Sequence, residues 1–322
     1  MARTFLKTAA IAAAAAIAGP AVAQDDYPAR PITMLGAYSP GGGTDVAART
    51  LVPFIEKYLD GADINVVNRP GAGGEVGFTA LANAETDGYT IGFINTPNVL
   101  TIPIERDTRY AIEDFQPVGN IVDDPGTFAV LPDSEFQSLE ELAAYAEENP
   151  GEVTYGSTGI GSDDHLAGLT FERQTGVTMQ HVPFGGSADV RAALLGGHID
   201  LAIINIGEAI KEDEAGRMRV LGQMAEERWE GAPDVPTFRE QGFDIVSGSQ
   251  RGIAVPAGVD PAIVQKVAAA IEQAVKDPAF REKAAEQALP LRYLGPDEYA
   301  ALLQASNENA REIWAENPWA SN

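Results

Sequence analysis

Four glycine-rich loops, each placed between a short apolar run and a helical pattern, constrain the fold of this chain most strongly. They are 39–45 (SPGGGTD), 68–77 (NRPGAGGEVG), 155–165 (YGSTGIGSDDH) and 182–190 (VPFGGSADV). One such loop could be an ordinary tight turn. Four of them indicate the edge of an open α/β sheet, where ligands bind and helix N-termini offer unpaired N–H donors with a partial positive charge.

The surrounding pattern alternates between strands and helices. We expect strands at 32–37, 64–68, 90–95, 152–157, 178–184 and 199–204, and helices at 44–59, 75–84, 139–149, from 163 onward and at 187–197. Thr44 or Asp45 is expected to cap the helix at 44–59. This order predicts parallel sheets covered on both faces. The tail, with helices at 261–275, from 278 and at 296–314 and an apolar run at 289–294, is expected to pack back onto the first unit.

The two α/β units predict two lobes with a ligand cleft between them. We expect lobe 1 to comprise 24–122 and 251–322, and lobe 2 to be inserted as 123–250. Two crossover segments would join the lobes, near 115–132 (FQPVGNIVDDPGTFAVLP) and 243–256 (FDIVSGSQRGIAVP).

Residues 1–23 read as a secretory signal peptide. Arg3 and Lys7 precede an Ala-rich apolar run, and Ala21-Val22-Ala23 supplies the small-x-small pattern of a cleavage site. We therefore expect a periplasmic protein. The chain contains no cysteine, which excludes a lipid-anchored cysteine, cysteine catalysis and disulfides.

The chain is strongly acidic, with a formal net charge of −25. Such a surface repels nucleic acid and anionic membranes, so we expect no nucleic-acid partner. We interpret the charge as a device for solubility, and we expect a monomer.

Nucleotide and metal motifs are missing from the sequence. The loop GAGGEVG has Val76, and the loop GIGSDD has Asp164, where a dinucleotide fingerprint needs its third glycine. The loop GGGTD lacks the lysine of a phosphate loop, and no G-x-S-x-G elbow occurs. His165 stands beside Asp163 and Asp164 without metal-ligand spacing, which favours a helix-capping Asp pair with an ordinary His. We expect no cofactor and no metal.

Arg251 is the cation of greatest interest, because it lies in the second crossover. A guanidinium there could grip a ligand carboxylate through two parallel hydrogen bonds. It could equally form a salt bridge between the lobes, and the sequence leaves both interpretations open.

Five segments carry a resemblance to a known family: 27–51, 66–93, 155–176, 181–203 and 252–261. Together they resemble the Bug-type periplasmic receptors, the substrate-binding subunits of tripartite tricarboxylate transporters, over about 27–314. The resemblance implies a type II periplasmic-binding-protein fold and an organic-anion ligand, most commonly a di- or tricarboxylate, an acidic amino acid or an aromatic acid.

The family binds carboxylates through loop amides, hydroxyls and bridging waters. Carried onto this chain, that implies contacts from Tyr38, Ser39, Gly42, Gly43 and Thr44 on one side, and from Ser157, Thr158, Gly159, Ser162, Gly185 and Ser187 on the other. Thr96, Asn98 and Asn205 follow strands at the same edge. Many members have an aromatic or small residue where this chain has Arg251, which predicts a ligand with an extra carboxylate.

These observations predict a receptor, not an enzyme, that captures a small carboxylate by lobe closure and passes it to membrane permease subunits. A di- or tricarboxylate is the expected ligand. Two alternatives stay open: a secreted α/β enzyme that uses His165 or Asp164 on a small organic acid, and a chemosensory binding protein not coupled to transport.

Overall fold

The computed structural model describes residues 27–316 and 318–319. The predicted signal peptide, 1–23, lies outside the described residues. The strands are β1 (Ile32–Gly36), β2 (Ile64–Asn68), β3 (Thr90–Asn95), β4 (Phe115–Val130), β5 (Thr154–Ser157), β6 (Gln180–Pro183), β7 (Leu201–Asn205), β8 (Arg219–Gln223), β9 (Gly248–Pro256) and β10 (Leu291–Leu294). The helices are α1 (Gly43–Tyr58), α2 (Glu75–Ala82), α3 (Asn98–Glu105), α4 (Leu139–Glu148), α5 (Asp163–Thr175), α6 (Ser187–Leu195), α7 (Ile206–Glu214), α8 (Pro261–Lys276), α9 (Pro278–Glu286) and α10 (Pro296–Glu316).

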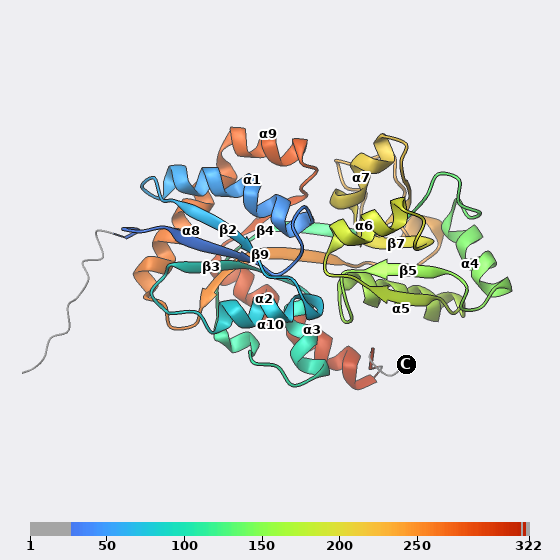
Figure 1. The fold of residues 1–322 in the computed structure, drawn as a ribbon, viewed down its shortest axis with the longest axis horizontal. Helices are drawn as coiled ribbons and strands as arrows, with labels where there is room; N and C mark the ends of the chain where they lie inside the picture. The colour runs from blue at the N-terminus through green and yellow to red at the C-terminus, as the bar shows by residue number, and fades with distance from the viewer. Residues whose placement is uncertain (1–26, 317, 320–322) are drawn as a thin grey trace, which may run out of the picture.

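Two lobes are built around the two halves of one sheet (Figure 1). In lobe 1 the strands run in the order β2-β1-β3-β9-β4, with β10 also paired to β4. In lobe 2 the far half of β4 pairs with β7 and β8, and β5 and β6 follow β7. The predicted α/β fold with two lobes is confirmed.

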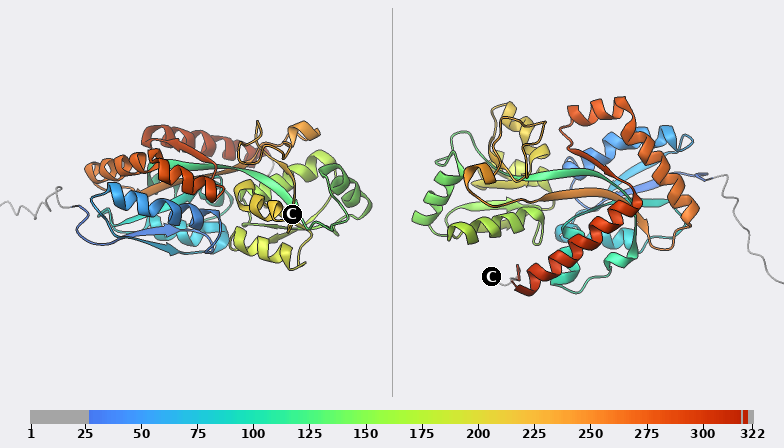
Figure 2. Two further views of the ribbon diagram at one scale, coloured as in Figure 1. Left: turned by 90° about the horizontal axis from the view of Figure 1, so that it is seen from above. Right: turned by 180° about the vertical axis from the view of Figure 1, so that it is seen from behind.

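β4 and β9 are the connections between the lobes. They pair antiparallel from Phe115 opposite Pro256 to Pro125 opposite Gly248. Seen from behind, they run side by side from one lobe into the other (Figure 2). The predicted crossover segments, 115–132 and 243–256, overlap these two strands.

Each lobe has its own hydrophobic core. One core joins β1, α1, β3, β9 and α8 in lobe 1, and the other joins β4, β5, α5 and β7 in lobe 2. Helix α8 shows how the sequence produces this packing. Val264, Val267, Ala268 and Ile271 recur at helical spacing, are buried, and belong to the lobe 1 core. Two separate cores allow the lobes to keep their shape independently.

Several local expectations need correction. Gly42 is the N-cap of α1, and no side chain caps that helix. Thr44 instead accepts a hydrogen bond from Asn95, and Asp45 binds the Gly41 N–H and Arg49, so neither is the cap. Ser162, and not the Asp pair, caps α5. Helix α3, helix α7 and strand β8 are not among the elements predicted from the sequence.

Candidate functional site

The glycine loops of the two lobes touch each other directly. The Ser39 N–H donates to the Gly185 carbonyl oxygen (3.3 Å), and the Ser39 hydroxyl donates to the Asp189 carboxylate (2.7 Å). Nearby, the Arg191 guanidinium donates to the Gly41 carbonyl oxygen (3.0 Å). The loop after β1 in lobe 1 therefore meets the loop after β6 in lobe 2, as expected for a site shared between the lobes.

A second contact joins the start of α1 to the start of α7. The Gly43 N–H donates to Glu208 Oε1 at 2.9 Å. A Cβ at Gly43 would lie 2.2 Å from that oxygen and 2.3 Å from Arg251 Nη1, so only glycine permits this approach. A carboxylate at a helix N-terminus is electrostatically favourable. In this arrangement the Gly43 N–H, which the resemblance predicts to bind a ligand carboxylate, is bound to the carboxylate of Glu208 instead.

Arg251 stands at the centre of this contact. Its side chain is 2% exposed. Nη1 forms an ion pair with Asp124 Oδ2 at 3.0 Å, and Nη2 donates to Asn205 Oδ1 (2.7 Å) and Glu208 Oε1 (3.0 Å). The salt-bridge interpretation of Arg251 is confirmed, whereas its contact with a ligand stays a prediction.

The loop after β2 links further predicted residues. The Gly73 carbonyl oxygen accepts from the Asn98 amide (3.0 Å) and from the Tyr38 hydroxyl (3.3 Å). Gly159 of lobe 2 comes so close that a Cβ on it would lie 2.7 Å from Gly73 Cα. The Thr101 hydroxyl donates across the same boundary to the Gly161 carbonyl oxygen (2.7 Å).

The loop that opens α5 is held by local hydrogen bonds. The Thr158 N–H and hydroxyl donate to Asp164 Oδ2 at 3.0 and 2.5 Å. The Ser162 hydroxyl accepts from the His165 N–H (3.1 Å), as an N-cap does. This loop is therefore a fixed wall of the site.

Two stacked histidines pack next to this loop. The rings of His165 and His181 stack with centroids 4.2 Å apart, and His181 Nε2 lies 2.6 Å from Ser157 Oγ. Burial lowers the pKa of His165 to about 3 and that of His181 to about 4. Both imidazoles are neutral near pH 7. Ser157 therefore faces a histidine, whereas the loop residues that follow it reach lobe 1.

Buried carboxyl groups gather around Arg251. Burial raises the pKa of Asp124 to about 7 and that of Asp163 to about 6, against the charge of Arg251, which lowers both. Burial and the charge of Asp163 raise the pKa of Asp164 well above its ordinary value. The Asn205 amide donates to Asp163 Oδ2 at 2.7 Å. We call Asp124, Asp163, Asp164 and Glu208 the acidic cluster.

Several buried polar atoms in or near the cluster have no hydrogen-bond partner within the described part of the chain. Two of them, Asp124 Oδ2 and Arg251 Nη1, face each other in the ion pair at 3.0 Å. Three others are Asn95 Oδ1, Asp164 Oδ1 and Ser187 Oγ. Their residues are 3%, 1% and 2% exposed. A buried polar atom without a partner costs about 1–3 kcal/mol, so these atoms point to a group that the site is built to receive.

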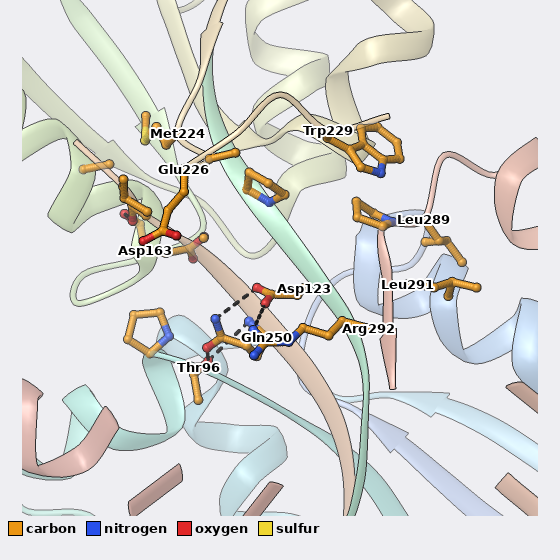
Figure 3. A pocket seen from close by; sticks show the side chains of 18 of the residues that line it. Thr96, Asp123, Asp163, Met224, Glu226, Trp229, Gln250, Leu289, Leu291 and Arg292 are labelled. Carbon is orange, nitrogen blue, oxygen red and sulfur yellow. Dashed lines mark hydrogen bonds and ion pairs between the residues drawn. The ribbon is translucent and has the colours of Figure 1, made fainter. Parts of the chain in front are cut away.

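The predicted residue Thr96 lines a large groove, as does Asp163 of the acidic cluster. The Thr96 hydroxyl donates to Gln250, and both residues line this groove of about 1430 Å³, which flanks the crossover strands (Figure 3). Asp123, Trp229, Leu289 and Arg292 also line this groove. None of the other predicted site residues belongs to its lining.

Sequence reasoning missed Asn95, Asp124 and Glu208 as members of the site. Only Glu208 had a local signal, because Asn205 and Glu208 form a capping box at the start of α7. Asp124 comes into the site through its pairing with Arg251, which no local pattern shows. Among residues 27–316 and 318–319, no group of three or more His, Asp and Glu side chains is arranged to hold a metal ion. Within the same residues, no helix is long and apolar enough to span a membrane.

The fold and the facing loops define a solute-binding protein of the periplasmic type. The structure of periplasmic binding protein BugD is similar, with a TM-score of 0.85 and 27% identity, and the match covers 90% of this chain and 98% of that one. The model of the tripartite tricarboxylate transporter family receptor matches residues 48–317. This chain belongs to that family, as the resemblance predicted.

Two relatives show the same membership. The UPF0065 protein in the gbd 5′ region of Cupriavidus necator is 34% identical over 92% of each chain. Protein BugT of Bordetella pertussis is 33% identical over 89% of this chain and 88% of its own length.

Two similar structures carry ligands. MatC from Rhodopseudomonas palustris has bound malate (TM-score 0.82, 26% identity, covering 89% of this chain and 99% of that one). Rpa4515 of R. palustris is described with adipate (TM-score 0.85, 26% identity, covering 90% and 98%).

Proposed function

We propose that this chain is a periplasmic receptor that captures a small organic carboxylate between its lobes and delivers it to the membrane permease of a tripartite tricarboxylate transporter. The observation that carries the proposal is the meeting of loops from both lobes. Ser39 reaches Gly185 and Asp189, and Gly43 reaches Glu208. A ligand held there touches both lobes only when they are closed, so its binding favours closure.

Malate and adipate in two similar structures support a carboxylate as the ligand class. The predicted preference for a di- or tricarboxylate stays a proposal, as does delivery to a permease. The proposed hinge is the β4–β9 pair. In this pair Val122 lies opposite Arg251 and Asp123 lies opposite Gln250. The two predicted lobe boundaries, 122/123 on β4 and 250/251 on β9, are therefore directly opposite each other.

The geometry around His165 supports binding without turnover. Its Nδ1 accepts from the Gly161 N–H (3.2 Å), and its ring stacks on His181. The lowered pKa, about 3, leaves little base strength at neutral pH. An imidazole engaged in this way is a poor general base for a bound acid.

Native mass spectrometry of the freshly purified mature chain, followed by thermal shifts across a panel of organic acids, tests the proposal. We expect one acid at a stoichiometry of one per chain, recovered unchanged, and a melting temperature that rises with its concentration. Conversion of the bound acid, abolished by His165→Gln, would contradict the proposal and favour the enzyme. Deletion of the gene should abolish uptake of that acid by cells. Unimpaired uptake would contradict the transport role.

A further inference from the structure

A tryptophan close to the C-terminus is buried, although the end of the helix before it is not. Residues 311–316 of α10 are exposed or half-buried, whereas Trp319 is 4% exposed. The first half of α10 belongs to lobe 1, because Tyr299 and Leu303 pack in a hydrophobic cluster with Phe78 of α2. From there α10 runs diagonally toward lobe 2 (Figure 2). A buried side chain beyond an exposed helix end needs partners outside its own helix.

Trp319 has these partners in both lobes. Its Nε1–H donates to Glu105 Oε2 of α3, in lobe 1, at 3.0 Å. On the lobe 2 side, a Cβ on Gly161 would lie 3.3 Å from the same nitrogen. The indole also lines a cavity of about 450 Å³ together with Leu169 and Val177 of lobe 2. The ring is therefore held between the two lobes.

The lobe 1 partner of Trp319 is itself fixed by charges. Glu105 Oε1 pairs with Arg106 Nη1 at 2.7 Å, and Arg106 Nη2 pairs with Glu75 Oε2 at 2.9 Å. The same guanidinium donates to the Ala72 carbonyl oxygen (3.1 Å), in the loop after β2. Trp319 therefore lies at one end of a series of hydrogen bonds and ion pairs that reaches a glycine loop of the candidate site.

We propose that Trp319 is a latch that holds the two lobes in their closed arrangement. Opening of the lobes moves Gly161 away from the indole and exposes the ring to water, which is unfavourable for a large and mostly apolar side chain. The latch raises the closed fraction of the chain before any ligand binds. A ligand that binds only the closed form then binds more tightly, because a larger fraction of the chain is already competent. This inference goes beyond the proposed function, since it concerns the lobes of the free chain.

Distances between the lobes in the ligand-free chain test this inference. The chain has no cysteine, so Glu85→Cys in lobe 1 and Ala192→Cys in lobe 2, both at exposed positions, accept one nitroxide label each. After refolding from urea without any organic acid, electron–electron double resonance measures the fractions of closed and open chains. We expect a closed fraction at the distance between these two positions in the structure. Trp319→Ala should lower the ratio of closed to open chains at least about tenfold.

Two further variants make the test specific. Leu303→Ala is the matched control, because Leu303 is 3% exposed and lies on the same helix within lobe 1. It should lower the melting temperature and leave the distances unchanged. Trp319→Leu keeps an apolar side chain and should lower the ratio less than Trp319→Ala does.

Three outcomes would overturn the latch. They are a wild type with no closed fraction, equal distances for wild type and Trp319→Ala, and a shift in Leu303→Ala as large as that in Trp319→Ala. The receptor function would stand in each case, because no ligand enters the measurement.

Discussion

Arg251 and its neighbours show how single residues hold the two lobes together. The guanidinium lies on a crossover strand, and its partners come from the other crossover strand and from the start of α7. Removal of one partner from a buried ion pair leaves a charge uncompensated, which is costly. Gly43 completes the arrangement, because its lack of a side chain lets Glu208 reach the α1 N-terminus.

His181 predicts a pH effect on stability. Its pKa is about 4 in the folded chain against an ordinary value of 6.5, so the unfolded chain binds a proton between these values that the folded chain does not. Its neighbours are Ser157, His165 and Tyr155, whose ring centroid lies 5.0 Å away. When the pH falls from 7 to 4.5, the unfolding free energy of the wild type should decrease by about 1 to 2 kcal/mol more than that of His181→Gln. This difference is smaller than the full pKa shift would give, because the His181 ring is only part-buried.

Urea denaturation at several pH values checks this prediction. His198→Gln is the control, because the His198 side chain is exposed. It should follow the wild-type profile. Parallel profiles for wild type and His181→Gln would show that the buried imidazole does not resist protonation.

At the scale of helices and strands, local sequence signals predicted most of the fold. The predicted strands 64–68 and 90–95 match β2 and β3, and the helices expected from 163 and 278 begin there as α5 and α9. Periodicity and helix-start signals are local, so one sequence contains them. The full length of β4 was not evident, because pairing with strands distant in the chain determines it.

Part of the candidate site could likewise be predicted from the sequence, and part could not. Strand-to-helix loops are local features, so their glycines and hydroxyls could be proposed from the sequence. The acidic cluster could not, because Asp124 and Arg251 are 127 positions apart and only the folded chain joins them. Thr96 also follows a strand at the expected edge. Its side chain lines the groove that flanks the crossover strands, and its contact with a ligand stays a prediction.

The N-cap of α5 should affect both the stability of the chain and its affinity for the ligand. Ser162→Ala removes the bond to the His165 N–H and should lower the unfolding free energy by about 1 kcal/mol. Because the first turn of α5 carries Asp163 and Asp164, fraying of that turn should also weaken ligand binding several-fold. Denaturation and calorimetry measure the two effects.

Ser138→Ala is the matched control for that prediction. Ser138 caps α4 by accepting from the Glu141 N–H at 3.1 Å, the same distance as in α5. It should lower stability by a similar amount and leave affinity unchanged. Equal affinities for both variants would mean that the α5 terminus is not part of the binding site.

At the scale of the whole molecule, two strands connect two lobes with separate cores, and the loops at the rim hold the lobes together. The contacts between these loops are hydrogen bonds and an ion pair, and a small apolar cluster also joins Ala288 to Ile206 and Ile210 of α7. Such an arrangement lets the lobes part without disturbing either core, which a ligand needs in order to enter.

A disulfide across the rim tests whether the lobes must part. The chain has no cysteine, and a Cβ on Gly185 would lie 3.1 Å from Ser39 Oγ, so Ser39→Cys with Gly185→Cys places two thiols within disulfide reach. Oxidation should hold the loops together and slow ligand association at least about tenfold, and reduction should restore it. Ser39→Cys alone is the control and should bind equally in both conditions. Stopped-flow measurements decide the question, because equally fast binding by the oxidised double variant would mean that the ligand enters without separation of the lobes.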